Sequence, residues 1–176
     1  MSRISASELA ESLSKFRCRK DKDIECFLRE KSVIYENRGW CSTYLLINEE
    51  ELVNHNNIFI EGYFSLSHKI VRLSEHVSKT RRKKLFHGVQ NHGNYLHVIL
   101  IGQLGKYIGE GDDISKITAT DMLECAFEII YQVKNRITCS CVMVECKDLE
   151  KVKSIYGGYG FAELQREELI QYFIRI

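Results

Sequence analysis

The chain has 176 residues, of which 44% are hydrophobic and 28% charged, and its formal net charge is +1. A chain of this size and composition buries a substantial core, which argues against extensive disorder, and its near-neutral charge excludes a grossly basic nucleic-acid-binding protein. No apolar run reaches the ~20 residues of a membrane helix, and the first residues lack the apolar core of a signal peptide. We expect one cytoplasmic domain over residues 1–176.

The seven cysteines also point to a reducing compartment. Their number is odd and no export signal precedes them, so they are expected to be free thiols and not a disulfide framework. Cys139, Cys141 and Cys146 lack a C-x2-C pair and a nearby histidine, which makes buried core thiols the better interpretation. We therefore predict no metal site.

The first half of the chain predicts two helices followed by two strands. Ser5 and Glu8 form a capping-box pattern that opens a helix to about Phe16. Apolar residues at helical spacing predict a second helix from about Asp21, which Gly39 ends. The runs 42–47 and 58–67 predict strands. The polar stretch 73–94 is typical of an insertion or mobile loop with one helical turn.

The second half predicts the centre of a sheet and the helices that cross it. Residues 95–104 form the most hydrophobic strand, as expected at the centre of a sheet. A glycine-containing loop leads to a helix over 119–134, then a strand over 139–146, a short helix over 148–156 and a last strand over 169–176. The pattern predicts one α/β domain with a mixed, twisted sheet.

The segment Val152–Phe161 contains the most informative motif: a short helix, Tyr156, a glycine turn, then Gly160-Phe161 and a new strand. This order resembles the last motif of the GCN5-related N-acetyltransferases (GNAT), in which Tyr, three residues and Gly-Phe follow one another. The alternative is a purely structural role, in which Tyr156 is a core aromatic residue on an amphipathic helix.

Further segments resemble the toxin-like bacterial branch of this superfamily, and the likeness spans residues 16–176. They are Phe16-Arg17-Cys18, Thr43-Tyr44-Leu45, Gly62–Ser67 and Leu100–Lys106. The resemblance implies a GNAT fold, with a mixed, mostly antiparallel central sheet that is splayed at the cofactor cleft and flanked by helices.

The resemblance also implies an acyltransferase that moves an acetyl group from acetyl-CoA to a primary amine by direct attack. Tyr156 would be the general acid for the departing thiolate, because a phenol has a pKa near ~10, close to that of a thiol. Main-chain amides of Leu104, Gly105 and Lys106 would hold the acetyl and pantetheine groups. The pyrophosphate would lie at the start of the following helix, over Ser115, Lys116, Ile117, Thr118, Ala119 and Thr120.

Two features favour an alternative function. In the family's phosphate-loop pattern only Ala119 fits, since Ile114 and Ile117 replace the basic or amide residue and the first glycine. The sequence does not identify a general base, because Glu61 and Glu145 are both compatible with a structural role. The alternative is a GNAT-fold binding module, for RNA or protein, that has lost catalysis.

The acceptor is suggested by a basic run at residues 79–84, in which we expect Arg81, Arg82 and Lys83 to bind substrate. Clustered cations gain affinity for nucleic acid through counterion release, and relatives in the branch acetylate aminoacyl-tRNA. A solvated loop explains the run equally well. We further expect an antitoxin-like protein partner and a homodimer, without a membrane.

Overall fold

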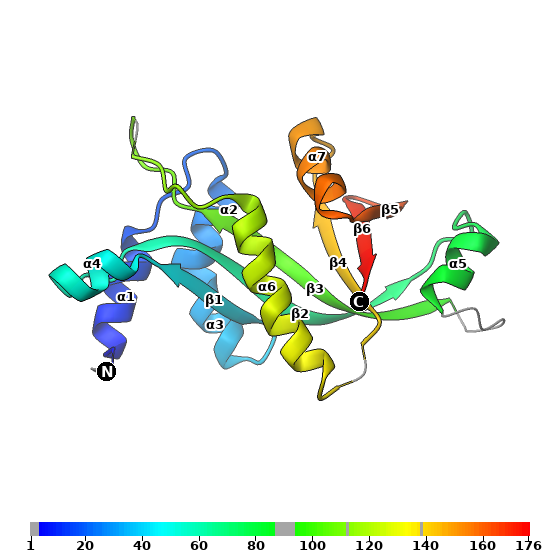
Figure 1. The fold of residues 1–176 in the computed structure, drawn as a ribbon, viewed down its shortest axis with the longest axis horizontal. Helices are drawn as coiled ribbons and strands as arrows, with labels where there is room; N and C mark the ends of the chain where they lie inside the picture. The colour runs from blue at the N-terminus through cyan, green and yellow to red at the C-terminus, as the bar shows by residue number, and fades with distance from the viewer. Residues whose placement is uncertain (1–3, 87–93, 112, 138) are drawn as a thin grey trace. The chain divides into compact units, whose positions relative to one another are not determined.

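A computed structural model describes residues 4–86, 94–111, 113–137 and 139–176 (Figure 1). The elements in the first half are α1 (Ala6–Lys15), α2 (Lys22–Cys26), a π-helix (Phe27–Lys31), α3 (Ser32–Asn37), β1 (Ser42–Ile47), α4 (Glu49–His55) and β2 (Ile60–Arg72). The second half contains α5 (Lys79–Leu85), β3 (Tyr95–Lys106), α6 (Ala119–Lys134), β4 (Cys141–Cys146), α7 (Glu150–Tyr159), β5 (Ala162–Arg166) and β6 (Ile170–Arg175). Among the described residues, no helix combines the length and the apolar character needed to cross a membrane.

The six strands form one mixed sheet in the order β1-β2-β3-β4-β6-β5. β3 and β4 are parallel, whereas β6 runs antiparallel to both β4 and β5. A parallel pair requires a crossover connection, and α6 lies in the segment between β3 and β4. The predicted α/β class and mixed sheet are confirmed.

The chain divides into two compact units, each described below by itself. Unit 1 comprises Met1–Ser65 and Gln103–Glu124, and unit 2 comprises Leu66–Gly102 and Cys125–Ile176. The prediction of a single domain over 1–176 stays a prediction.

In unit 1, the core forms around Tyr63 of β2, which is fully buried. Its ring packs edge-on against Phe16, with ring centroids 5.5 Å apart, and stacks on Phe27, with ring centroids 6.0 Å apart. Its hydroxyl donates a 2.7 Å hydrogen bond to the carbonyl oxygen of Ile24. The buried carboxylate of Glu25 accepts a 2.7 Å bond from the amide of Cys18. The N-terminal helices are thereby fixed to β2.

The helices of unit 1 follow the sequence prediction with two corrections. The capping box of Ser5 and Glu8 is present. The predicted second helix is divided by the π-helix Phe27–Lys31, and it ends at Asn37, before Gly39 at φ +66°. The polar residues after β1 begin a helix that the sequence analysis did not include, α4, which Asn48 caps by accepting from the amide of Glu51.

In unit 2, the stretch expected to be a mobile insertion contains helix α5. Ser78 caps the helix by accepting from the amide of Arg81, and Leu85 is fully buried in the hydrophobic cluster that also holds Val71 and Val98. The one helical turn predicted in this stretch was too short, because polar residues dominate the composition of the segment, while one apolar residue, Leu85, anchors the helix. Residues 87–93 of the same stretch lie outside the described residues.

The end of the chain contains β5, the new strand that the sequence predicted after Gly160-Phe161. β5 pairs with β6, and β6 pairs with β4 over Cys141–Cys146. α7 ends at Gly160, whose φ of +107° is a conformation that glycine adopts readily. Figure 1 shows α7 next to β4 and β6.

Candidate active site

Tyr156 of α7 is a buried phenol without a hydrogen-bond partner among the residues that the structure describes. Its side chain is 8% exposed and lies 5.6 Å from the ring of Phe161 and 6.4 Å from that of Tyr172. Within the described residues, no hydrogen bond reaches its hydroxyl. Burial, with a smaller contribution from the thiol of Cys146, raises the pKa of Tyr156 to about 12. The hydroxyl therefore stays protonated at neutral pH and has a proton to donate.

The ladder between β3 and β4 ends close to this phenol. It consists of three pairs, from Ile99–Val142 to Ile101–Val144. Beyond it β4 continues for two residues, Glu145 and Cys146, which pair only with β6 on the other side among the described residues. The β3-facing edge of β4 is therefore unpaired at Glu145 and Cys146, which we call the β3–β4 opening. Unpaired strand edges offer amide and carbonyl groups to a ligand.

Glu145 belongs to a row of polar side chains across unit 2. Glu145, Gln171 and Gln165 stand directly opposite one another on β4, β6 and β5. Gln171 donates to Glu145 at 2.8 Å, and Gln165 donates to Gln171 at 2.9 Å. Lys69 of β2 donates to both carboxylate oxygens of Glu145 at 2.7 Å.

The sequence analysis named Glu145 but missed its two partners, Lys69 and Gln171. Gln171 interrupts an apolar strand and was a usable signal, since buried polar groups require partners. The partners themselves depend on strand register, which a single sequence does not give. The other candidate base, Glu61 of unit 1, accepts from the side chain of Asn48 at 3.2 Å.

The predicted cofactor-binding residues lie in unit 1. Leu104, Gly105 and Lys106 form the end of β3. A Cβ at Gly105 would lie 2.2 Å from Cγ2 of Ile24, so this glycine is required by the packing of unit 1. The ammonium of Lys106 donates to the carbonyl oxygens of Ser115 and Ile117 at 3.1 and 3.2 Å, which places a positive charge in the loop before α6.

Side chains at the start of α6 accept hydrogen bonds from some of the backbone amides there. Thr118 Oγ1 accepts from the amide of Asp121, and the Asp121 carboxylate accepts from the amide and the hydroxyl of Thr118. These hydrogen bonds hold the pKa of Asp121 below its usual range. Within the described residues, the amides of Ala119 and Thr120 have no partner.

This arrangement fits an anionic group at the start of α6 only in part. Two unbonded amides and the exposed Lys116 favour a phosphate, whereas the carboxylate of Asp121 opposes it. Ile117, one of the departures from the family pattern, lies close to Gly62 of β2. Sequence reasoning missed Asp121, although Thr118-x-x-Asp121 has the spacing of a capping box.

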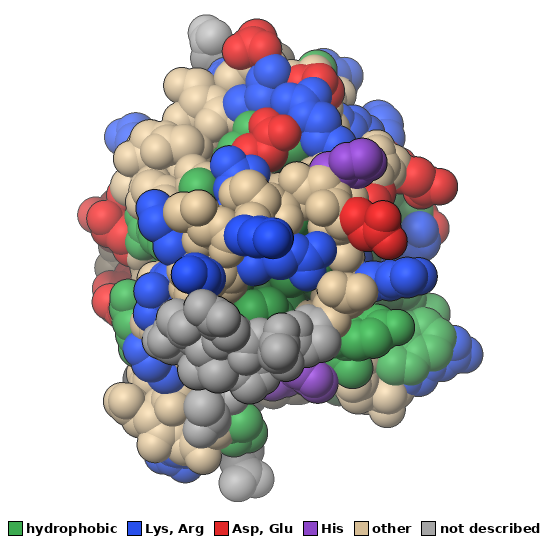
Figure 2. Space-filling model, turned by 90° about the vertical axis from the view of Figure 1, so that its right-hand side faces the viewer, with side chains coloured by type: hydrophobic (Ala, Val, Ile, Leu, Met, Phe, Trp, Pro, Cys, Tyr) green, Lys and Arg blue, Asp and Glu red, His purple; other side chains and the backbone are tan. Residues whose placement is uncertain are grey.

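The predicted substrate-binding residues lie on α5 and differ in their contacts. Arg82 donates to the carbonyl oxygens of Val77 and Ser74 and to the side chain of Asn94. Arg81 makes one 3.3 Å bond, to the carbonyl oxygen of Leu164. Lys83 is exposed, and no partner for it is found within the described parts of the chain. Figure 2 shows Lys and Arg side chains gathered on one face of the molecule.

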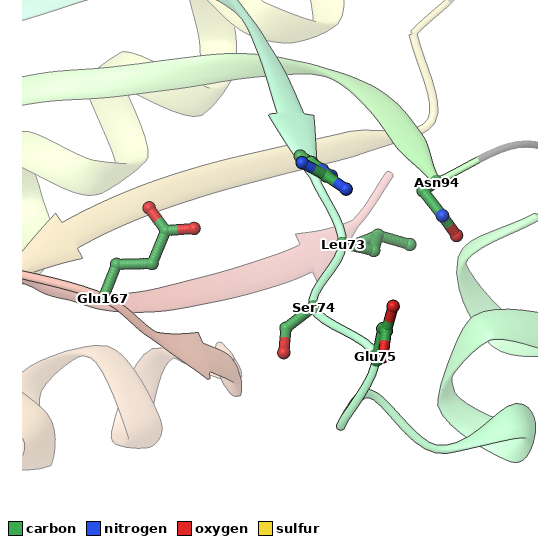
Figure 3. Close-up of a pocket in the computed structure, with 6 residues that line it drawn as sticks. Leu73, Ser74, Glu75, Asn94 and Glu167 are labelled. Atoms are coloured by element: carbon green, nitrogen blue, oxygen red, sulfur yellow. The ribbon is translucent and has the colours of Figure 1, made fainter.

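A small open pocket of about 200 Å³ lies beside α5 (Figure 3). It is lined by Arg72, Leu73, Ser74, Glu75, Asn94 and Glu167. Figure 3 shows Ser74 and Glu75 on the segment that follows β2, with Asn94 and Glu167 on other segments of unit 2. Its charges are of both signs, and none of the predicted site residues lines it.

The cysteines agree with the sequence interpretation of free core thiols. All seven cysteines are free thiols, and Cys139, Cys141 and Cys146 are buried. The described residues contain no group of three or more His, Cys, Asp or Glu side chains that could hold a metal ion.

Solved structures share the fold of this chain. A tyrosine-to-phenylalanine mutant of KacT matches with a TM-score of 0.73 and 16% identity, over 98% of this chain and 92% of that chain. AtaT complexed with acetyl-methionyl-tRNAfMet matches with a TM-score of 0.68 and 19% identity, over 93% and 86%. AtaTR bound with AcCoA matches with a TM-score of 0.67 and 18% identity, over 93% and 86%.

No protein-family model and no curated protein matches the chain. At the identities above, the structural matches establish the fold. The chain shares the fold of KacT and AtaT, which agrees with the GNAT fold that the sequence predicted.

Proposed function

We propose that this protein is an N-acetyltransferase that transfers an acetyl group from acetyl-CoA to a primary amine, with the amino group of an aminoacyl-tRNA as its acceptor. The observation that carries the proposal is Tyr156, a buried phenol with no hydrogen-bond partner among the described residues, beside the unpaired end of β4 in a GNAT fold. The matched structures support it, because they include AtaT with acetyl-methionyl-tRNAfMet and AtaTR with AcCoA.

The chemistry assigned to the chain's own residues is limited and specific. Acetyl-CoA, when bound, supplies the thioester. The unpaired edge of β4 would hold the acyl end, and Tyr156 would donate its proton to the departing sulfur. The two unbonded amides at the start of α6 would hold phosphate oxygens, together with Lys116 nearby in sequence and Lys106, whose ammonium bonds the carbonyl oxygens of Ser115 and Ile117. Leu104 and Gly105 would contribute main-chain groups.

Partners and location form the second part of the proposal. One matched structure is AtaT bound to the C-terminus of the antitoxin AtaR and Acetyl-CoA, and another is a KacTA–DNA complex. These support an antitoxin-like protein partner for this chain. We also propose a homodimer, and a cytoplasmic location, where charged tRNA and acetyl-CoA are both found.

A GNAT-fold binding module without catalysis is the second candidate. The carboxylate of Asp121 favours it, since a negative charge at the start of α6 opposes the diphosphate of acetyl-CoA. Titration calorimetry with acetyl-CoA separates the two functions, because a binding module that has lost the cosubstrate gives no heat of binding.

The decisive experiment is acetyl transfer from labelled acetyl-CoA to charged tRNA, with uncharged tRNA, peptides and small amines in parallel. We expect label in charged tRNA and none in uncharged tRNA, because only the former has a free α-amino group. Transfer only to a peptide or a small amine would mean that the protein is an acetyltransferase with an acceptor other than charged tRNA. Absence of transfer to every amine, together with absence of binding, would overturn the proposal.

A further inference from the structure

Lys69 places a primary amine at the β3–β4 opening. Its Nζ lies 2.7 Å from each carboxylate oxygen of Glu145, the first β4 residue beyond the last ladder pair. Lys69 belongs to β2, which stands on the far side of β3 in the strand order. The β3 residue after the last pair is Gly102, which has no side chain to obstruct the ion pair.

Glu145 and Tyr156 flank this opening from opposite faces of the sheet. Side chains alternate along a strand, so Glu145 and its neighbour Cys146 point to opposite faces. The ring of Tyr156 lies 6.4 Å from that of Tyr172, which stands opposite Val144 on the same face of β4 as Cys146, so the phenol lies on the Cys146 side. An acyl group held in the opening would therefore meet an amine from one face and a phenol from the other.

The polar row fixes the position of this amine. Glu145 is held by Gln171, and Gln171 by Gln165, which also accepts from the amide of Ser74 and donates to the carbonyl oxygen of Arg72. A nucleophile held in place reacts at a high effective concentration. The side chain of Lys69 is 36% exposed and that of Glu145 19%, so water reaches the pair and can accept a proton.

We infer that Lys69 is a site of self-acetylation, an inference that rests on the proposed acetyltransferase function. In this reaction the Nζ of Lys69 loses one proton to solvent by way of Glu145 and forms a bond to the acetyl carbon. The thioester C–S bond breaks, Tyr156 gives its proton to the sulfur, and the second proton lost by the nitrogen returns Tyr156 to its neutral form. The products are a neutral acetyl-lysine, which no longer pairs with Glu145, and free CoA.

The test is incubation of the purified full chain with acetyl-CoA, followed by intact-mass measurement and peptide mapping. We expect one acetyl group per chain, located at Lys69. Lys69→Arg keeps the positive charge beside Glu145 and should remain unmodified. Tyr156→Phe should slow the modification about 10-fold or more, as loss of one positioned acid does. Lys153→Arg is the matched control, since Lys153 of α7 is also held by carboxylates, those of Asp148 and Glu150, and should behave as wild type.

Other outcomes would overturn the inference. Acetyl groups spread over many lysines, at a rate that Tyr156→Phe does not change, indicate spontaneous chemistry. A protein that binds acetyl-CoA in calorimetry and acetylates an added amine, but leaves Lys69 unmodified, removes the self-acetylation and keeps the proposed function. A protein that shows neither binding nor transfer removes both.

Discussion

The guanidinium of Arg82 donates a 2.6 Å hydrogen bond to the carbonyl oxygen of Ser74. The same group also bonds Val77 and Asn94, so it connects α5 to the end of β2 and to the residue before β3. Of the three basic residues predicted to bind substrate, Arg82 thus has its donors committed to the fold, whereas the side chain of Lys83 extends into solvent.

The first prediction separates these two kinds of cation. A Lys83→Ala, Lys84→Ala double variant should keep its thermal stability and weaken binding of charged tRNA, with a salt dependence flatter by up to about two units, because each phosphate contact contributes nearly one unit. Arg82→Ala should instead lower the melting temperature. Filter binding over a range of salt concentrations and thermal denaturation measure the two effects. A double variant with the wild-type salt slope would show that α5 does not contact the acceptor.

The second prediction concerns Tyr156. Tyr156→Phe removes only the hydroxyl and should lower acetyl transfer by about 10- to 1000-fold, the usual contribution of one positioned acid. Affinity for acetyl-CoA, measured by calorimetry, should hardly change, since the ring packing is kept. Tyr131→Phe, at an exposed residue of α6, is the control and should retain full activity. Unchanged turnover in Tyr156→Phe would assign Tyr156 to packing.

The third prediction tests the carboxylate at the start of α6. Asp121→Asn removes a negative charge from the helix end and should bind acetyl-CoA several-fold more tightly, because a charge near a helix terminus contributes roughly 0.3–1 kcal/mol. The same change should slightly lower the stability, because Asn accepts the hydrogen bonds of Thr118 less strongly. Glu124→Gln changes the net charge equally, one turn further along α6, and should leave affinity unchanged. Equal affinity in all three proteins would mean that the start of α6 does not meet the phosphates.

The fourth prediction uses the close packing of Gly105 against Ile24. Gly105→Ala should destabilise the protein by about 1–3 kcal/mol, the range found for overpacking, because the added Cβ would lie 2.2 Å from Cγ2 of Ile24 and 3.0 Å from Cε1 of Tyr63. In the double variant Gly105→Ala, Ile24→Ala, the loss of stability should be smaller than the sum of the losses in the two single variants. Gly157→Ala, where a Cβ would meet nothing within 4 Å, is the control. Urea denaturation of wild type and of the four variants measures these losses.

The fifth prediction follows from the raised pKa of Tyr156. Burial raises this pKa to about 12, against about 10 for a phenol in the unfolded chain. The unfolded chain therefore releases the proton first, so the stabilisation is complete below about pH 10 and is lost as the pH rises through about 12. The free energy of unfolding should fall with pH in this window more steeply for wild type than for Tyr156→Phe, by at most about 1.4 kcal/mol per pH unit. If the free energies of unfolding of the two proteins changed with pH in parallel, the phenol of Tyr156 would be exposed to water in the folded protein.

The sequence predicted the elements whose determinants are local. The capping box of Ser5 and Glu8 and the glycine turn after Tyr156 placed α1 and α7, because each pattern lies within a few residues. The length of α5 was underestimated, since it is anchored by Leu85 in a distant cluster, and the pairing of the strand after Gly160-Phe161 with β6 was not predicted, since it depends on register. The ion pair of Lys69 and Glu145 could not be predicted at all, because it joins residues 76 positions apart.

The short ladder between β3 and β4 has a consequence for the order of folding. Its partners, such as Ile99 and Val142, are farther apart in sequence than those of the other recorded strand pairs in unit 2. Closing a loop of about 40 residues costs about 3 kcal/mol of chain entropy. The three pairs of this ladder offset that cost only after the loop has closed, so the ladder is expected to form slowly. The β5–β6 hairpin and the β4–β6 pairing close shorter loops and should form earlier. We therefore expect the two strands that border the opening to meet last, so that the site is completed only when the rest of unit 2 has folded.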